Sequence, residues 1–225
     1  MKRFFVVCAL AGLAAAGTAR AADPELKTDD DKTFYALGLY FANQLSIFKL
    51  TPAELEIIKT GLTDGVLKKP AKVELEKFGP KFKPLADARM AAGAADEKKK
   101  GKAFLETIAA KPGIKKTGSG LLMETVKEGT GKSPVPNDTV KVNYKGTLID
   151  GKEFDSTAKH GGTPSSFKMD ANLIKCWNEA LEFMKPGGKA KIYCPAELAY
   201  DDKPKGEIPP GATLVFELEL LEIVK

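Results

Sequence analysis

Histidine is almost absent from this sequence, because His160 is the only one in 225 residues. A metal site built on several imidazole ligands is therefore excluded. A Ser-His-Asp arrangement would have to use His160, which lies in a glycine-rich segment where a surface loop is the simpler interpretation. No other nucleophile has a neighbouring base in the sequence. We therefore expect no metal, no cofactor and no covalent catalyst.

Long hydrophobic runs are also missing. Residues 4–16 are apolar, but this run is too short to span a membrane and no stop-transfer pattern follows it. Lys2 and Arg3 precede the run, and Ala19-Arg20-Ala21 follows it with the small-x-small pattern of signal cleavage. The alternative is a buried N-terminal helix. We predict that residues 1–21 are a secretory signal, and that the mature chain is soluble in the periplasm or secreted, without stable membrane insertion.

A strong excess of charge of one sign is absent too. The chain has 35 basic and 30 acidic residues, and loss of Lys2, Arg3 and Arg20 with the signal leaves 32 against 30, a net charge of +2. The charges are interleaved, as in D-E-K-K-K at residues 96–100, which is typical of a solvated helix face. This balance argues against nucleic acid as a partner.

A phosphate-binding loop is excluded by three residues. The segment G-T-G-K-S at residues 129–133 has the ending of such a loop. The first glycine of the motif would fall at Val126, and Pro134 and Pro136 prevent the helix that must follow. We interpret the segment as a turn.

The N-terminal part of the mature chain has the apolar spacing of two short amphipathic helices. Apolar residues recur at steps of three and four at Phe34, Leu37, Phe41, Leu45 and Phe48, and again at Leu55, Ile58, Leu62 and Val66. Thr51-Pro52-Ala53-Glu54 has the form of a capping box with proline at the first helical position. Two such helices cannot bury both stripes alone. We therefore predict that residues 22–83 are a helical domain through which the protein forms a homodimer.

Residues 84–111 are rich in alanine and lysine and stop at Pro112-Gly113, which predicts one long helix. A helix of this length spans about 40 Å, enough to hold two domains apart. Gly93 and Gly101 weaken the prediction, and a charged flexible linker is the alternative. We assign residues 84–115 to a connecting helix.

The apolar period changes after Gly118. Alternating residues predict strands at Val140, Val142 and Tyr144, at Ala190, Ile192 and Cys194, and at Leu214, Phe216, Leu218 and Leu220. One helical stripe interrupts them, at Leu173, Ile174, Trp177, Leu181 and Met184. The predicted fold class is α+β, with an antiparallel sheet packed on one short helix.

Several motifs in this part of the chain resemble one family. They are V-K-V-N-Y-K-G-T-L-I-D-G-K-E-F-D-S at residues 140–156, L-I-K-C-W at 173–177, L-A-Y at 198–200 and I-P-P-G-A-T-L-V-F-E-L-E-L-L at 208–221. In this order they resemble the FKBP family of peptidyl-prolyl cis-trans isomerases. The resemblance covers residues 118–225, and we assign 116–225 to an FKBP-type domain. Upstream, the helices resemble the dimerising arm of the Mip and FkpA group of secreted bacterial members.

The resemblance implies a proline pocket between the sheet and the short helix. It implies a catalytic set of Tyr144, Phe154, Asp155, Trp177, Tyr200 and Phe216, with Trp177 as the floor and Tyr200 as a phenol donor. It also implies a substrate-binding set of Phe167, Leu173, Ile174 and Ile208, in which the backbone of Ile174 hydrogen-bonds the substrate. Without the resemblance, aromatic residues at these strand and helix positions would be interpreted as core.

Four positions depart from the family pattern. Lys175-Cys176 replaces the common Pro-Gly or Arg-Gly, Leu173 replaces a usual valine, and Asp201 takes a glycine position. Cys176 and Cys194 are an even pair in a chain predicted to be exported, and both are expected near the seam of helix and sheet. They are either a disulfide or two buried free thiols.

Three functions are compatible with this sequence. The first is an isomerase that accelerates proline-limited folding of exported polypeptides, with binding of macrolide inhibitors implied by the resemblance. The second is a holdase-type chaperone in which paired arms hold unfolded chains. The third is a secreted proline-binding module in which turnover is secondary. The complete pocket motif favours the first function.

Overall fold

The computed structural model describes residues 24–224, so the predicted signal at residues 1–21 lies outside the described part of the chain. The chain divides into two compact units, Met1–Gln44 and Leu45–Lys225. Within residues 24–224 no helix combines the length and the apolar character needed to cross a bilayer.

The first unit contains helix α1 (Asp29–Leu45) except for its last residue. Thr28 and Asp31 cap its start reciprocally: the Asp31 N–H donates to Thr28 Oγ1 at 3.1 Å, and the Thr28 N–H donates to Asp31 Oδ2 at 2.8 Å. Three aspartates in the first turn complement the helix dipole. No residue of α1 is buried, and Phe34, on the predicted apolar stripe, is 70% exposed.

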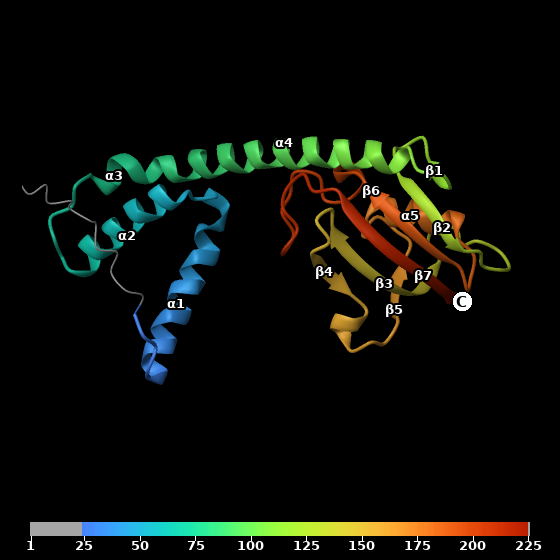
Figure 1. The fold of residues 1–225 in the computed structure, drawn as a ribbon, viewed down its shortest axis with the longest axis horizontal. Coiled ribbons are helices and arrows are strands. Elements are labelled where there is room, and N and C mark those ends of the chain that lie inside the picture. The colour runs from blue at the N-terminus through green and yellow to red at the C-terminus, as the bar shows by residue number, and fades with distance from the viewer. Residues whose placement is uncertain (1–23, 225) are drawn as a thin grey trace, which may run out of the picture. The chain divides into compact units, whose positions relative to one another are not determined.

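The second unit begins with the remaining helices. They are η1 (Ser46–Phe48), α2 (Pro52–Val66), α3 (Leu75–Phe78), η2 (Gly79–Lys81) and α4 (Phe82–Ala109). The predicted capping box is present at the start of α2, since Thr51 accepts from the Glu54 N–H and the Glu54 side chain accepts from the Thr51 N–H. Figure 1 shows α4 as one continuous helix.

Arg89 on α4 ties η1 and α2 to the long helix. Its guanidinium donates to the Phe48 carbonyl at 2.7 Å and pairs with both oxygens of the Glu54 carboxylate. A bidentate pair of this kind fixes orientation as well as distance. Gly93, one turn further along α4, lies under the Lys49 side chain, where a Cβ would overlap the lysine. Gly93, one of the two glycines that weakened the helix prediction, is therefore the point where the Lys49 side chain packs closely on α4.

The rest of the second unit is an antiparallel sheet with one α-helix. The strands are β1 (Ile114–Lys116), β2 (Leu122–Lys127), β3 (Thr139–Leu148), β4 (Glu153–Ser156), β5 (Ser165–Lys168), β6 (Lys189–Cys194) and β7 (Leu214–Val224). Their order is β1-β2-β6-β7-β3-β4, and β5 pairs with β3. The helix is α5 (Lys175–Phe183), and short 3-10 turns lie at η3 (Ala158–His160) and η4 (Ala196–Leu198). The predicted α+β class is confirmed.

The main core lies between α5 and the sheet. Helix α5 buries Cys176, Trp177, Ala180 and Leu181 against strand residues that include Ile192. Cys176 and Cys194 form a disulfide with a Cα–Cα distance of 5.8 Å, which joins the start of α5 to the end of β6. A bridge across a separation of 18 residues contributes about 3 kcal/mol in the chain-entropy account.

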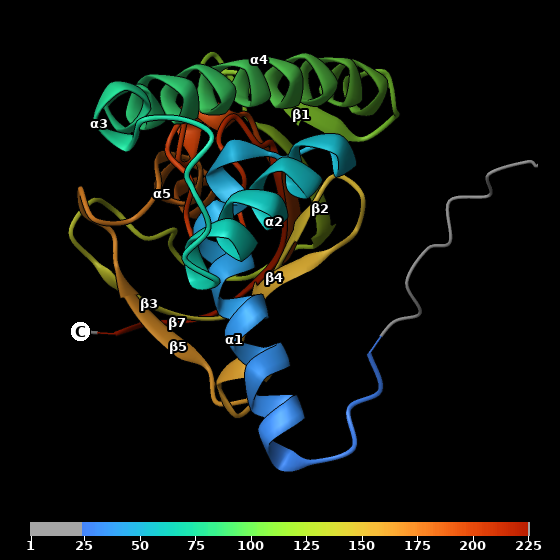
Figure 2. The same cartoon turned by 90° about the vertical axis from the view of Figure 1, so that its left-hand side faces the viewer.

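A second cluster joins the last turns of α4 to the sheet. Ile108 is buried together with Leu122, Tyr193 and Val215. Partly buried Phe104, Leu105 and Ile114 pack against this cluster. Both ribbon views show α4 above the sheet, with β1 following its C-terminal end (Figure 1, Figure 2). The C-terminal half of the expected connecting helix is therefore packed on the sheet.

The Glu54–Arg89 pair predicts a specific loss of stability in acid. Hydrogen bonds from Arg89 and then from Thr51 lower the pKa of the Glu54 carboxyl from 4.5 to about 2. A carboxyl whose pKa is lowered by folding stabilises the fold above its unfolded pKa and loses that effect as pH falls through its folded value. We expect Glu54→Gln to reduce the free energy of unfolding at pH 7, and the difference from wild type to disappear between pH 4.5 and about pH 2.

Urea denaturation followed by circular dichroism across this range measures the difference. Glu56→Gln, in which an exposed carboxylate on the same helix loses its pairing with Lys59, is the matched control. A difference that stays constant down to pH 2 would contradict this assignment to Glu54 and Arg89.

Candidate active site

An aromatic pocket of about 200 Å³ opens where β3, β4, β5 and β7 meet the start of α5. It is lined by Tyr144, Phe154, Asp155, Phe167, Asn172, Leu173, Ile174, Trp177, Tyr200 and Phe216. Most of these side chains are half-buried, while Trp177 and Phe216 are only 3% and 4% exposed. The pocket is thus an indentation in the main core, made of the same residues that pack α5 on the sheet.

Trp177 is the centre of a ring cluster. Its ring centroid lies 5.2 Å from that of Tyr144, and 5.3 Å from those of Phe167 and Phe216, with interplanar angles of 75°, 79° and 86°. Phe154 meets Phe216 at 5.6 Å and 89°. These edge-to-face contacts are the favoured geometry for aromatic pairs and hold each ring in one orientation. The indole Nε1 of Trp177 has no acceptor within residues 24–224.

The segment before α5 is held by a side chain of the helix. Asn178 Nδ2 donates to the Asp170 carbonyl at 2.9 Å and to the Leu173 carbonyl at 3.2 Å. Ile174 is the N-cap of α5, and its carbonyl accepts from the N–H groups of Trp177 and Asn178. The Ile174 N–H itself donates to no group in the described chain. A fixed, unpaired backbone donor therefore lies at the edge of the pocket.

Gly146 on β3 lets two of the aromatic walls close together. A Cβ at this position would lie 2.6 Å from Phe154 Cζ and 2.8 Å from Phe216 Cε1, closer than side chains pack. The requirement here is for space and not for an unusual backbone angle. A larger residue at 146 would push at least one wall outward.

A short polar chain borders the apolar hollow. The Tyr144 hydroxyl donates to Asp155 Oδ2 at 2.9 Å, and Asp155 Oδ1 accepts from the Ser156 N–H at 2.9 Å. His160 Nε2 lies 2.8 Å from the same Oδ1. Burial, and then the bond to Asp155, raises the pKa of Tyr144. Burial, and then the charge of Asp155, raises the pKa of Tyr200, so both phenols remain proton donors at neutral pH.

The pocket brings together nine of the ten residues singled out in the sequence. The exception is Ile208, which is 5% exposed in the main core and whose backbone pairs with Lys205. Asn172 lines the pocket but was not expected, because an exposed asparagine between an alanine and a leucine has no distinctive sequence signal. The contact of His160 with Asp155 was also missed, since it depends on how η3 folds back after β4.

Asp201 shows how the chain accommodates one departure from the family pattern. Its φ is 51°, in the left-handed region that favours glycine and that aspartate tolerates better than most residues. Lys98 on α4 donates to Asp201 Oδ1 at 2.7 Å and pairs with Asp202 at 2.8 Å. The aspartate that follows the pocket residue Tyr200 is therefore held by the long helix.

The close approach at Gly146 predicts that Gly146→Ala disturbs the pocket. We expect a loss of about 1–3 kcal/mol in the free energy of unfolding, because the added methyl forces Phe154 or Phe216 out of its position. Trp177 is the only tryptophan, so its fluorescence emission reports the altered surroundings. Gly118→Ala adds a methyl to open space and is the control. Unchanged stability and emission in Gly146→Ala would mean that the rings are not tightly placed.

The comparisons with known proteins cover nearly the whole described chain. The sequence matches the family of FKBP-type peptidyl-prolyl cis-trans isomerases over residues 130–221. It also matches the domain amino terminal to FKBP-type peptidyl-prolyl isomerase over residues 30–124.

Individual relatives agree with these family matches. FkpA from Escherichia coli K12 is 40% identical, with 93% of this chain and 82% of the relative covered. The outer membrane protein MIP of Legionella longbeachae is 35% identical, with 100% of this chain and 99% of the relative covered. The crystal structure of FkpA from Escherichia coli superposes with a TM-score of 0.67, covering 88% of this chain and 98% of that one. With the fold, the family motifs and these relatives in agreement, the chain belongs to the family of FKBP-type peptidyl-prolyl cis-trans isomerases.

Proposed function

We propose that the aromatic pocket is where this isomerase turns over X-Pro bonds, and that its clients are exported polypeptides whose folding waits for proline isomerisation. The observation that carries the proposal is the ring cluster around Trp177, an apolar hollow with donors only at its edge. The proposed catalytic set is Tyr144, Phe154, Asp155, Trp177, Tyr200 and Phe216, with Phe167, Leu173 and Ile174 binding the substrate around it.

The reaction suits such a site because no bond is broken. Resonance holds the imide planar, and rotation faces a barrier of ~18–20 kcal/mol. The twisted state has lost much of the charge separation of the planar amide, so an apolar cavity with little water favours it over the ground state. Each lowering of the barrier by about 1.4 kcal/mol accelerates rotation tenfold. No nucleophile or metal is needed for this.

The polar groups have separate proposed roles. The unpaired N–H of Ile174 and the phenol of Tyr200 hold the substrate backbone, so that rotation is confined to one side of the imide. Asp155 fixes the Tyr144 ring through its hydrogen bond. An apolar hollow bordered by donors also suits a macrolide inhibitor, and we propose that such compounds compete with the proline.

We further propose that the protein works in the periplasm or outside the cell. The predicted signal at residues 1–21 carries this proposal. The Cys176–Cys194 disulfide supports it independently, because such bridges persist in oxidising compartments. Exported polypeptides would meet the enzyme there before they fold.

Two substitutions test the pocket directly. Tyr200→Phe removes one donor, and Phe154→Ala opens a half-buried wall; we expect each to lower kcat/KM on a proline tetrapeptide by about tenfold to a hundredfold. Phe183→Ala removes a ring that is 46% exposed and outside the pocket, so its turnover should match wild type. Wild-type turnover in both pocket variants would contradict the assignment of this pocket as the active site.

A second activity is carried by the apolar surface of the N-terminal helices. No residue of α1 or α2 is buried, although Phe34, Leu37 and Phe41 on α1 and Leu62 and Val66 on α2 are large apolar side chains. Exposed apolar stripes of this size mark interaction surfaces. We propose that residues 22–83 form the homodimer interface, and that the paired arms hold unfolded chains as a chaperone.

Phe41→Glu tests this association. A charge in the centre of the α1 stripe should convert a dimer into a monomer, which light scattering measures at micromolar concentration. Ala36→Glu places the same charge on the opposite face of the helix and should leave the dimer intact. The monomeric variant should also lose suppression of aggregation while it still turns over the tetrapeptide. Wild type that scatters as a monomer would remove the proposal.

A further inference from the structure

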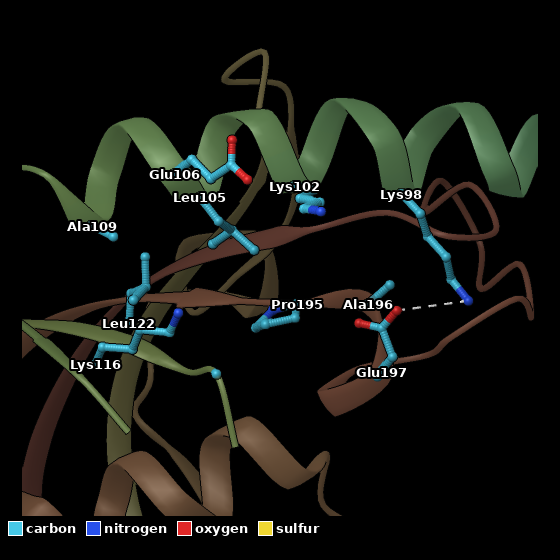
Figure 3. Close-up of a pocket in the computed structure, with 11 residues that line it drawn as sticks. Lys98, Lys102, Leu105, Glu106, Ala109, Lys116, Leu122, Pro195, Ala196 and Glu197 are labelled. Atoms are coloured by element: carbon cyan, nitrogen blue, oxygen red, sulfur yellow. Dashed lines mark ion pairs between the residues drawn. The ribbon is translucent and has the colours of Figure 1, made fainter. Parts of the chain in front are cut away.

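A second hollow of about 410 Å³ lies outside the aromatic pocket, between α4 and the sheet. Figure 3 shows Leu105 pointing from the helix toward Leu122 and Pro195 on the opposite wall. Lys102 stands on the helix side of this groove, and Lys116 stands on the sheet side. We call it the α4 groove, and its lining shares no residue with the aromatic pocket.

The floor of the α4 groove is rigid. Leu122 is buried at 1% exposure, and Leu105 packs on the cluster that Leu122 forms with Ile108, Tyr193 and Val215. Gly101 on α4 lies against Thr213 so closely that a Cβ would overlap the threonine hydroxyl. A groove between elements locked in this way is preformed, so binding requires little ordering of the protein.

The rim of the groove favours an acidic occupant. Lys98 already pairs with Glu197, Asp201 and Asp202. Lys102 and Lys116 have no ion-pair partner within residues 24–224. Two acids line the groove, Glu106 and Glu197, and Glu197 pairs with Lys98. Two free ammonium groups above an apolar floor complement a segment that carries both apolar and carboxylate side chains.

The groove and the aromatic pocket lie close together along the chain. Ala196 and Glu197 of η4 line the groove, and Tyr200 lines the aromatic pocket. Two residues separate Glu197 from Tyr200, so the Cα atoms of these two lining residues are at most about 11 Å apart. Phe216 of the pocket packs on the α5 side of the sheet and Leu122 of the groove on the α4 side, so a client that occupies both sites must pass around the sheet near η4.

We propose that the α4 groove is a second client-binding site, which takes an extended, apolar and acidic segment of the same polypeptide whose proline is being isomerised. The proposal rests on the proposed function of the aromatic pocket. Binding at two joined sites raises the effective concentration of the second contact without any change in the chemical step. The groove would thus lower KM for long clients and leave kcat unchanged.

The test fills the groove from an exposed position. Ala109 lies on its lining at the end of α4, so Ala109→Phe occupies the space without touching the core. Ala103→Phe, at an exposed position of the same helix outside the groove, is the matched control. The substrates are a proline tetrapeptide, and the same peptide extended on either side by about ten residues rich in Asp and Leu, a reach of about 33 Å.

We expect Ala109→Phe to raise KM for at least one extended peptide about tenfold, with kcat and tetrapeptide turnover unchanged. The Ala103→Phe control should match wild type on every substrate. Equal KM values for both extended peptides in wild type and Ala109→Phe would overturn the proposal. Turnover of the tetrapeptide depends on the aromatic pocket alone. A failure of the proposed active site is therefore distinguishable from a failure of the proposed second binding site.

A direct binding measurement tests the groove independently of catalysis. The Asp- and Leu-rich tail alone, without proline and with a fluorescent label, should bind wild type by anisotropy and bind Lys102→Glu/Lys116→Glu at least about tenfold more weakly. Lys99→Glu/Lys111→Glu changes the net charge equally at exposed positions outside the groove and should bind like wild type. Equal binding by both double variants would show that overall charge attracts the tail, and would overturn the assignment to the groove.

Discussion

The packing of one indole against three aromatic rings is the contact on which the rest of this molecule depends. Trp177 is almost fully buried, and burial of a large aromatic side chain contributes about 2–3 kcal/mol, so it anchors α5 on the sheet. The same ring lines the pocket, together with Leu173 and Ile174 of the segment before α5. Stability and the shape of the pocket therefore have a common origin. The walls can stay in place without a substrate because the core holds them.

The long helix contributes to both ends of the second unit. Near its start, Arg89 pairs with Glu54 and donates to the Phe48 carbonyl. Gly93 leaves space for the Lys49 side chain. Further along, the α4 residues that face the loop between η4 and β7 are small or carry one cation. Ala94 lies under Gly211 and Gly101 lies under Thr213, while Lys98 holds the acids that follow Tyr200. These contacts let the helix backbone approach the loop that leads from η4 to β7. With larger residues at these positions, α4 would lie further from this loop, and it would not form one side of the α4 groove.

Much of the local structure could be predicted from residue patterns. Steps of three and four located α1, α2 and α5, alternation located the core of β3, β6 and β7, and Thr51 to Glu54 located the start of α2. The pocket was a different case. Periodicity alone made Tyr144, Phe154 and Phe216 core residues, and only the resemblance to a family indicated that they border a hollow. The pattern was misleading at Gly101, where the absence of a side chain is a requirement for close packing and not a sign of a weak helix.

Secondary structure follows from the sequence because its signals are local: capping hydrogen bonds and side-chain spacing act over a few residues, and each element carries its own. Contacts between distant residues have no such signal. Lys98 and Asp201 are 103 residues apart, and Arg89 and Glu54 are 35 apart. His160 reaches Asp155 only because η3 folds back after β4. Ile208 lies in the core beside the pocket and not in its lining for the same reason. Where separate elements meet depends on the packing of the whole domain, so the place of Asn172 in the pocket lining and the existence of the α4 groove emerge only in three dimensions.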